Sequence, residues 1–288
     1  IEEAGVHSGD SSCVIPPYEV SNKVKKEIET ITVKLALELK VVGLINLQFA
    51  VKDDKVYVLE VNPRSSRTVP FVSKYTNVPL ANIAAQISVG KSLDDFKLQK
   101  NNFEHFAVKK AVLPFKKFKD EKVFLGPEMK STGEVMGIDM STGSAFLKAM
   151  KSDGYNVPRK GTAFLSVNKT DRVGLIPIAK SLMDLGFSLV ATKGTCKFLN
   201  EHGIICNDMF KVGEGRPNVV DEILNDNIQL VINTPEGPQS RFDEEAIGKT
   251  SVMKNILTIT TLSGARAAID SMKHLNEISV KALQEYFK

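Results

Sequence analysis

The sequence predicts an α/β protein, with an α+β part up to residue 154 and a doubly wound parallel sheet in residues 155–288. Three observations support this division. Residues 43–62 alternate apolar and polar side chains with the period of two that is typical of a half-buried hairpin. Residues 152–158, SDGYNVP, have the composition of a linker. After residue 160, short apolar strands alternate with helical segments, an order that favours a parallel sheet.

The bulk composition is that of a packed protein with small-molecule ligands. The 288 residues allow two domains of ordinary size, and a net charge of +4 without a basic, aromatic-rich stripe argues against nucleic acid. No apolar run is long enough for a membrane helix, and no signal peptide is recognised. Three cysteines without paired spacing predict reduced thiols in a cytoplasmic protein. Because Ile1 already reads as the interior of a domain, we expect a fragment of a longer polypeptide.

The second strand of the hairpin ends in polar side chains. Glu60 and Asn62 are expected to share one face with Val58, because side chains alternate along a strand. A carboxylate and an amide at a strand end supply the hard oxygen ligands that Mg²⁺ prefers. Arg64 and Arg67 follow in the next loop, and their planar guanidinium groups suit the anion that such a metal neutralises.

The register of the hairpin decides whether its first strand contributes to this site. If residues 53–55 form a three-residue loop, Gln48 lies opposite Glu60 on the same face. A two-residue loop puts these two side chains on opposite faces. We adopt the three-residue loop, which gathers Gln48, Glu60 and Asn62 into one oxygen-lined patch. The alternative is an ordinary hairpin with a solvated polar end, and spacing alone does not separate the two.

The remaining elements of the first part are read from helix caps and periodicity. Ser21 is a candidate N-cap, and a glycine follows the end of the first helix at Gly43. The expected elements are loop and short strand in 1–17, helices at 20–39, 79–90 and 142–151, a polar loop at 91–102, and strands at 108–115 and 134–137.

In the second part, helices and strands follow one another in short alternation. Ligands of parallel sheets bind beyond the carboxyl ends of the strands. The segment 192–195, TKGT, lies at such an end and opens a helix, whose free N–H groups and dipole favour a phosphate. The expected strands are 162–167, 187–192, 228–233 and 256–260, and the expected helices are 175–185, 195–202, 218–225, 244–253 and 264–272.

The motifs around the hairpin resemble those of a known family. Gln48, the segment 60–64 (EVNPR) and Arg67 resemble the magnesium-ATP signature of the ATP-grasp superfamily. The continuation at 68–74, TVPFVSK, and at 78–81, VPLA, is similar to the second ATP-grasp half of carbamoyl phosphate synthetase large subunits. The resemblance extends from Ile1 to roughly the C-terminus.

This resemblance implies two domains. Residues 1–154 are expected to be the C-terminal part of the second, carbamate-phosphorylating ATP-grasp domain with its connecting segment. Residues 155–288 are expected to be the Rossmann-type, methylglyoxal-synthase-like domain that binds allosteric nucleotide effectors. The second domain shows no counterpart of the catalytic aspartates of methylglyoxal synthase, so we interpret it as regulatory.

The activity implied by the resemblance is the Mg-ATP-dependent phosphorylation of carbamate to carbamoyl phosphate, in arginine and pyrimidine biosynthesis. Arg64 and Arg67 are implied as catalytic residues, and Gln48, Glu60 and Asn62 as ligands of Mg²⁺ or Mn²⁺. The implied ATP contacts are Val6, His7, Ser8, Gln48 and Glu60. K⁺ is a further implied cation, a glutaminase small subunit is the implied partner, and the intact enzyme is expected to be an oligomer.

The resemblance also implies a site for a phosphorylated effector such as UMP or IMP, and leaves the choice and sign of the effector open. Its expected residues are Ser166, Arg172, Thr192, Lys193, Thr195, Lys211, Asn233 and Thr234. Arg172 stands where the family has a lysine, so the charge is kept and the shape of the side chain changes.

Two positions differ from the members of the family that respond to ornithine. Glu2 and Asp10 match acidic positions that contact this activator in some members. Lys110, however, stands in place of a glutamate, and Thr258 in place of a tyrosine. Because a lysine repels the ornithine ammonium group, we expect no activation by ornithine.

Two alternative functions stay open at this point. One is a stand-alone nucleotide-binding regulatory module, and the other is a different ATP-grasp ligase or carboxylase. Under the favoured interpretation, the fragment lacks the upstream strands that grip the nucleotide, the first ATP site and the glutaminase. We therefore expect no synthesis activity from the fragment alone.

Overall fold

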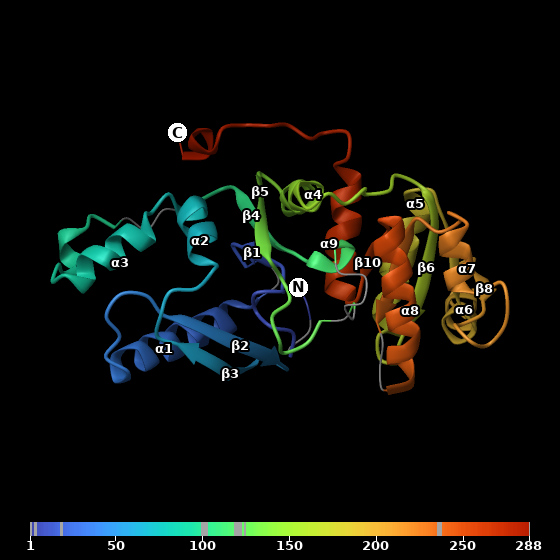
Figure 1. Ribbon diagram of the computed structural model, residues 1–288, viewed down its shortest axis with the longest axis horizontal. Helices are drawn as coiled ribbons and strands as arrows, with labels where there is room; N and C mark the ends of the chain where they lie inside the picture. Colours follow the sequence, from blue (N-terminus) through green and yellow to red (C-terminus); the bar gives the residue numbers. More distant parts are fainter. Residues whose placement is uncertain are drawn as a thin grey trace. The chain divides into compact units, whose positions relative to one another are not determined.

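The computed structural model describes residues 2, 5–17, 20–98, 103–117, 123, 125–234 and 238–287. The chain divides into two compact units (Figure 1). The first unit comprises Ile1–Cys13 and Ala107–Ser279, and the second comprises Val14–Phe106 and Val280–Lys288. The domain boundary between residues 154 and 155 that the sequence suggests stays a prediction.

A five-stranded parallel sheet dominates the first unit, with the strand order β10-β9-β6-β7-β8. Every residue of β9 is buried, as expected of a parallel strand with both faces covered. The strands are β6 (Gly161–Val167), β7 (Phe187–Thr192), β8 (Asn207–Met209), β9 (Leu230–Thr234) and β10 (Leu257–Ile259).

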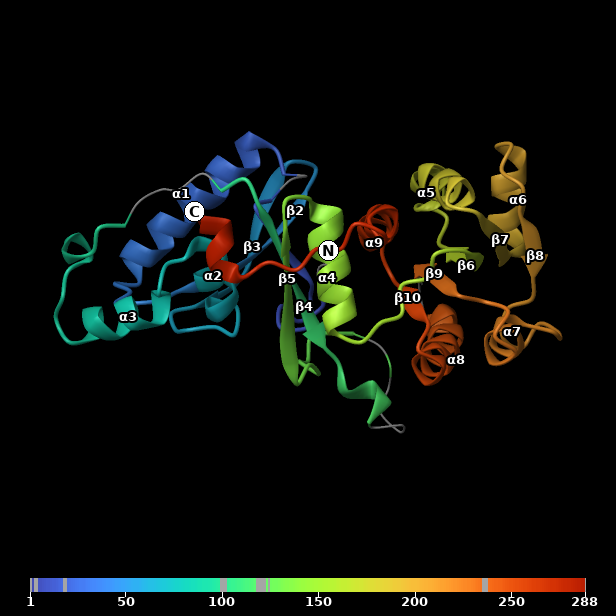
Figure 2. The same ribbon diagram turned by 90° about the horizontal axis from the view of Figure 1, so that it is seen from above.

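Helices cover both faces of this sheet (Figure 2). On one face lie α5 (Arg172–Asp184), α6 (Lys193–Glu201) and α9 (Leu262–Lys273). On the other lie α7 (Val219–Leu224) and α8 (Pro238–Lys254). The doubly wound parallel sheet predicted from the sequence is therefore confirmed. Sequence reasoning missed β8, whose three residues, NDM, are too few and too polar to show a period.

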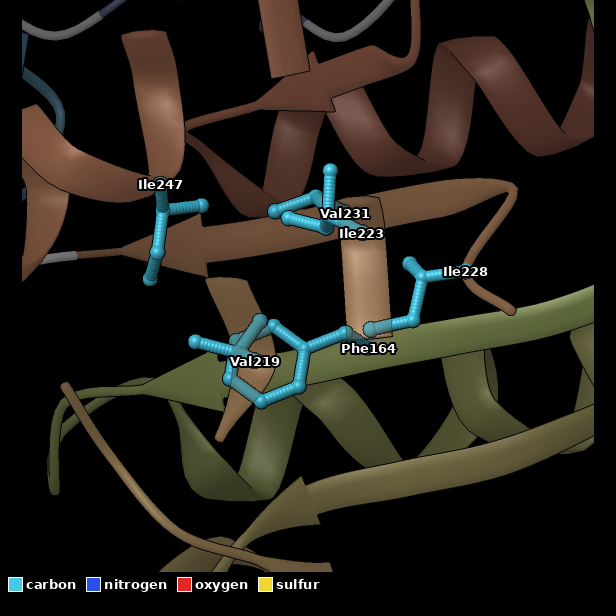
Figure 3. Close-up of a cluster of buried hydrophobic side chains, with 6 residues drawn as sticks. All are labelled: Phe164, Val219, Ile223, Ile228, Val231 and Ile247. Atoms are coloured by element: carbon cyan, nitrogen blue, oxygen red, sulfur yellow. The ribbon is translucent and has the colours of Figure 1, made fainter. Parts of the chain in front are cut away.

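A cluster of buried apolar side chains attaches α7 and α8 to the sheet (Figure 3). Phe164 comes from β6 and Val231 from β9, and neither side chain is exposed. Burial of such side chains contributes about 1.5–3 kcal/mol each, so this face is held mainly by the hydrophobic effect. The cluster consists of Phe164, Val219, Ile223, Ile228, Val231 and Ile247.

The first unit also contains most of a smaller sheet with the order β1-β4-β5. Its strands are β1 (Cys13–Ile15), β4 (Phe106–Val112) and β5 (Gly133–Asp139). The helix α4 (Thr142–Ser152) packs against both β5 and α9. The strands expected at 108–115 and 134–137 and the helix expected at 142–151 are thereby confirmed, within a few residues at each end.

The second unit contains a helical part and a separate hairpin. Its elements are α1 (Asn22–Glu38), β2 (Asn46–Lys52), β3 (Lys55–Asn62), α2 (Val69–Thr76) and α3 (Leu80–Ser88). Ser21 caps α1 as predicted, because its hydroxyl accepts from the N–H of Val24 at 3.3 Å. Helix α2 was not predicted, although Pro70 in its first turn and the left-handed Asn77 at its end are typical helix boundaries.

The hairpin has the expected pairing of Gln48 with Glu60, but its turn differs from the one expected. The predicted three-residue loop is wrong: Lys52 pairs with Lys55, and the two-residue turn of Asp53 and Asp54 has positive φ at both positions. A β-bulge at Leu59 then shifts the register, so that two residues of β3 face one residue of β2. The bulge restores the predicted pairing of Gln48 with Glu60.

The same bulge corrects the predicted faces of β3. Val58 pairs with Phe49, and Glu60 pairs with the neighbouring Gln48. Directly opposed residues of an antiparallel pair point to the same side of the sheet. Val58 and Glu60 are therefore on opposite faces, contrary to the simple alternation expected from the sequence.

The C-terminal residues belong to the second unit, where an aromatic cluster holds them. The imidazole of His105 is 2% exposed and lies 5.5 Å from the ring of Tyr286 and 5.4 Å from that of Phe287. Phe103 adds a T-shaped contact with Phe287 at 5.8 Å, and the ring of Tyr75 on α2 packs against both Phe103 and His105. Such ring pairs add to the stabilisation that comes from burial.

All three cysteines are free thiols, which agrees with the prediction of reduced cysteines. Burial, together with the neighbouring Cys196, raises the pKa of Cys206 to about 12, so this thiol is neutral near pH 7. Across the part of the chain that the structure describes, no helix is both long and apolar enough to span a membrane.

Candidate functional site

The hairpin face of the second unit carries the predicted metal ligands. Gln48 lies directly opposite Glu60, and Asn46 lies directly opposite Asn62. Because residues two apart in a strand share a face, these four polar side chains lie on one side of the hairpin. Glu60 is exposed, whereas the other three are half-buried. The patch thus combines one carboxylate with three amides.

This donor set fits a hard divalent cation that also binds phosphate. Mg²⁺ is usually held by one or two carboxylates and completes its coordination with water and phosphate oxygens. Within the described residues, no group of three or more His, Cys, Asp or Glu side chains forms a carboxylate-rich alternative. Sequence reasoning did not assign Asn46 to the site, although its alternation with Gln48 was a usable signal.

The two arginines follow the hairpin at the start of α2. The N–H of Arg64 donates to the carbonyl of Asn62 at 2.8 Å, so the chain turns directly after the last metal-ligand candidate. The guanidinium of Arg64 is exposed and donates to the carbonyl of Ser65 at 2.9 Å. Arg67 is half-buried and lies one residue before Thr68, the N-cap of α2. Both cations therefore follow the oxygen patch within five residues of chain.

The remaining candidate ATP contacts, Val6, His7 and Ser8, lie in the first unit. The N–H of His7 donates to the carbonyl of Gly126 at 2.7 Å, and the His7 Nδ1 accepts from the N–H of Gly9 at 3.0 Å. A side chain at Gly9 would collide with Met129, because its Cβ would lie 2.8 Å from the methionine sulfur. The glycine therefore permits a close packing of backbone against side chain at this point.

The carboxylate of Asp10 also holds this segment in place. Its carboxylate is 2% exposed and accepts from the N–H groups of Lys130 and Ser131, both at 2.8 Å. The hydroxyl of Ser131 in turn donates to the carbonyl of Gly9 at 3.2 Å. Asp10 therefore has a structural role in holding residues 7–10.

The candidate effector residues gather at the carboxyl ends of the parallel strands. Ser166 on β6 is in register with Asn233 on β9, and Thr192 ends the adjacent β7. The Thr195 hydroxyl, 1% exposed, contacts the Thr192 hydroxyl at 3.3 Å and accepts from the N–H of Val167 at 3.4 Å. The start of α6 is thereby tied to the ends of two strands.

Two further side chains close around the start of α6. A Cβ at Gly194 would lie 2.8 Å from the guanidinium of Arg172, so this glycine makes room for the arginine. The buried Nε of Arg172 has no hydrogen-bond partner within the described residues. Lys193, the residue before Gly194, is exposed. A cation with an unused donor at a helix N-terminus is suited to an anion.

Thr234 ends β9 in register with Val167, whereas Lys211 follows the edge strand β8, which pairs with β7. The Thr234 hydroxyl accepts from the backbone and side-chain amides of Asn168 at 3.3 and 3.4 Å, so it orders the loop after β6. Burial raises the pKa of Asp243 on α8, and the ammonium of Lys211 acts in the opposite direction. Asp243 therefore lies near the candidate effector lysine. Sequence reasoning missed this carboxylate because α8 carries it far from Lys211 in the chain.

Comparison with known families matches both parts of the chain. Residues 2–96 match the family model of the carbamoyl-phosphate synthase L chain ATP-binding domain, and residues 174–260 match that of the MGS-like domain. The carbamoyl phosphate synthase large chain of Acidobacterium capsulatum is 51% identical over 99% of this chain. That of Archaeoglobus fulgidus is 49% identical over 99%.

The chain is homologous to carbamoyl phosphate synthase large chains over nearly its whole length. It spans 27% of the Acidobacterium and Archaeoglobus large chains. The protein of Aquifex aeolicus named carbamoyl phosphate synthase large chain, C-terminal section, is 48% identical over the whole of this chain, which spans 58% of it. The ATP-binding match includes the hairpin and its arginines, and the MGS-like match includes the ends of β7 and β9.

The four positions that the sequence resemblance connects with ornithine line one cavity of the first unit. The cavity has a volume of about 250 Å³, and Glu2, Asp10, Lys110 and Thr258 are among its lining residues. The Lys110 ammonium pairs with Asp153 at 2.7 Å and lies 4.6 Å from the centre of the Tyr155 ring. At the position where the sequence resemblance has a glutamate, the cavity therefore has a lysine whose charge is paired with Asp153.

Proposed function

We propose that this chain takes part in the Mg-ATP-dependent phosphorylation of carbamate to carbamoyl phosphate. The observation that carries the proposal is the pairing of Gln48 with Glu60 and of Asn46 with Asn62 on one hairpin face. Arg64 and Arg67 follow this face within one loop. An oxygen patch followed closely in the chain by two arginines supplies the kinds of group that bind a metal-bound phosphoryl donor.

In this proposal, Gln48, Glu60 and Asn62 hold Mg²⁺ or Mn²⁺. The bound metal supplies charge neutralisation for in-line phosphoryl transfer. Arg64 and Arg67 bind the carbamate anion and keep its attacking oxygen oriented, so that positioning and electrostatics provide the catalysis. Val6, His7 and Ser8 contact the nucleotide, and no side chain acts as a covalent nucleophile. A further K⁺ ion belongs to the proposal without an assigned ligand set.

The proposed activity is that of a full-length large chain. The chain spans 27% of two of the large chains that it matches. The second unit also exposes apolar side chains on α1, with Val33 58% and Leu37 72% exposed. Such side chains are typical of a surface that another part of a protein covers. We propose that such a large chain is part of a cytoplasmic, oligomeric enzyme that works with a glutaminase subunit in arginine and pyrimidine biosynthesis.

The first unit is proposed to bind a phosphorylated effector such as UMP or IMP. Ser166, Thr192 and Asn233 line the strand ends, while Thr195, Lys193 and Arg172 surround the start of α6. The unused Nε–H of Arg172 and the helix N-terminus suit a phosphate group. Lys211 and Thr234 complete the proposed set. A separate regulatory module remains the second candidate, because this site lies within one unit.

Calorimetric titrations with UMP and with Mg·ATP test both sites in one experiment. Thr195→Ala is expected to weaken UMP binding about tenfold or more, the size of one or two lost hydrogen bonds, without changing Mg·ATP affinity. Asn62→Ala is expected to do the reverse. Lys193→Ala tests the same site at an exposed residue, so a loss of UMP binding in this variant is not explained by a loss of folding. Mg·ATP affinity that is unaffected by Asn62→Ala would favour the regulatory module.

Ornithine is expected to leave this protein unaffected. The Lys110–Asp153 pair removes the negative charge that an ornithine ammonium group needs, and Glu2 is engaged by the hydroxyl of Ser12 at 3.0 Å. Millimolar ornithine should therefore produce neither binding heat nor a shift of the thermal midpoint, under conditions in which UMP produces both. Saturable ornithine binding by the unmodified chain would contradict this expectation.

A further inference from the structure

Lys109 on β4 is a buried lysine that the proposed mechanism does not use. Its side chain is 1% exposed, and it is among the largest fully buried side chains of the described residues. Lysines are rarely buried to this extent unless a partner compensates their charge. Its neighbour Lys110 points to the opposite face of the strand, where it pairs with Asp153. The burial of Lys109 therefore needs a separate explanation.

The contacts of Lys109 link the sheet to the proposed nucleotide segment. Its Nζ donates to the carbonyl oxygen of Ser8 at 3.3 Å. The carboxylate of Glu134 on β5 supplies the counter-charge, with Oε1 at 3.7 Å from Nζ. That Oε1 is buried and has no hydrogen-bond partner within the described residues. The ammonium is thus compensated electrically by Glu134, while its hydrogen bond goes to the backbone of Ser8.

The Ser8–Gly9 peptide group is held at both ends. Its carbonyl accepts from Lys109, and its N–H donates to Nδ1 of His7 at 3.0 Å. A peptide group is planar, so fixing the direction of its carbonyl also fixes the direction of its N–H. Lys109 therefore acts on the imidazole of His7 through one rigid unit.

Further contacts of this segment come from a stretch of chain without regular secondary structure. Gly126, Lys130 and Ser131 hold His7, Gly9 and Asp10, and residues 126–131 form neither helix nor strand. Lys109, in contrast, extends from the middle of a strand of the small sheet. Of the hydrogen bonds named above, the one from Lys109 connects residues 7–10 to a regular element.

We propose that Lys109 is a positioning residue for nucleotide binding, which holds the Ser8–Gly9 peptide and thereby orients His7 and Ser8. This inference rests on the proposed function, because it takes residues 6–8 as nucleotide contacts. It adds a role for a residue that touches neither ATP nor metal in that proposal. The buried charge is retained because a carbonyl oxygen needs a donor at this depth, which an apolar side chain of equal volume cannot supply.

Two variants of the full chain separate positioning from stability. Lys109→Met keeps the volume but leaves Glu134 buried without a counter-charge, so it is expected to lower the thermal midpoint. The double variant Lys109→Met/Glu134→Gln removes both charges and should regain most of that loss. Lys148→Met is the matched control: Lys148 pairs with Asp139 at 2.8 Å and donates to the carbonyl of Ile138 at 3.1 Å.

The expected result is that Mg·ATP affinity falls about tenfold or more in both Lys109 variants, the size of one lost charge-assisted hydrogen bond. The Lys148 variant should bind Mg·ATP like the unmodified chain. Amide hydrogen exchange at Gly9 and Asp10 should accelerate in both Lys109 variants and not in the control. Normal affinity in the double variant would overturn the proposal, because Lys109 would then act through stability alone.

Hydrogen exchange also distinguishes this inference from the proposed function. If the unmodified chain binds no Mg·ATP, the proposed function fails in this chain, and exchange decides the role of Lys109 by itself. Faster exchange at Gly9 and Asp10 in the double variant would then support the holding of this peptide. Unchanged exchange would refute it, whatever the nucleotide result.

Discussion

Replacing Glu60 by alanine in a full-length large chain that carries this sequence is expected to lower carbamoyl phosphate formation about a thousandfold. Glu60 is the one carboxylate in the proposed metal set, and its partners on the hairpin face are neutral amides. A metal that neutralises phosphate charge contributes several kcal/mol to a phosphoryl transfer, and about 1.4 kcal/mol corresponds to a tenfold change in rate. The rate should be measured at saturating ATP over a range of Mg²⁺ concentrations.

Asp94→Ala provides the control for this substitution. Asp94 is an exposed carboxylate of the same unit and lies outside the hairpin and α1, so its loss changes the charge equally. The control should retain full activity, and the chain of 288 residues by itself should form no carbamoyl phosphate. A Glu60→Ala enzyme that keeps a tenth or more of the parental rate would exclude Glu60 as an essential metal ligand.

Gly137→Ala is expected to destabilise the first unit by about 3 kcal/mol or more, as overpacking against rigid backbone does. A Cβ at this position would lie 2.6 Å from the backbone nitrogen of Ala149 and would also collide with the carbonyl of Ala145. Both alanines are on α4 and are fully buried. The backbones of β5 and α4 therefore touch at Gly137, and neither can yield without moving a whole element.

Gly133 on the same strand supplies the comparison. A Cβ there would meet its nearest atom, on Val112, at 3.7 Å, which is ordinary van der Waals contact. Gly133→Ala should therefore change the free energy of unfolding by no more than about 1 kcal/mol. Urea unfolding of both variants measures the difference. Equal stability of the two would show that α4 and β5 do not pack as closely as the structure has them.

The hairpin illustrates how a correct pairing can follow from an incorrect turn. Sequence alternation suggested that Gln48 faces Glu60, and this pairing is confirmed. The three-residue loop assumed for it is wrong, since Asp53 and Asp54 form a two-residue turn and the bulge at Leu59 supplies the missing shift. Leu59 is an ordinary strand residue, and a bulge has no signature in such a side chain.

Helix α2 and Asp10 illustrate two other reasons why sequence reasoning was incomplete. Helix α2 carried usable signals at Pro70 and Asn77, but its eight residues are short for a periodic pattern. Asp10 matched a ligand position of the family, yet its carboxylate binds the N–H groups of Lys130 and Ser131, 120 and 121 residues away. Nothing near Asp10 in the sequence indicates these partners.

The sequence by itself determined what depends on neighbouring residues: the cap at Ser21, the alternation that ends at Glu60 and Asn62, and the order of strands and helices after residue 160. These features follow from backbone geometry and local burial, which leave a period in the chain. Only the tertiary structure decided the bulge at Leu59 and the hydrogen bond from Lys109 to Ser8, which lie 101 residues apart in the chain. Both features depend on residues far apart in the chain. The partner of a buried charge, in particular, is whichever group the fold brings next to it.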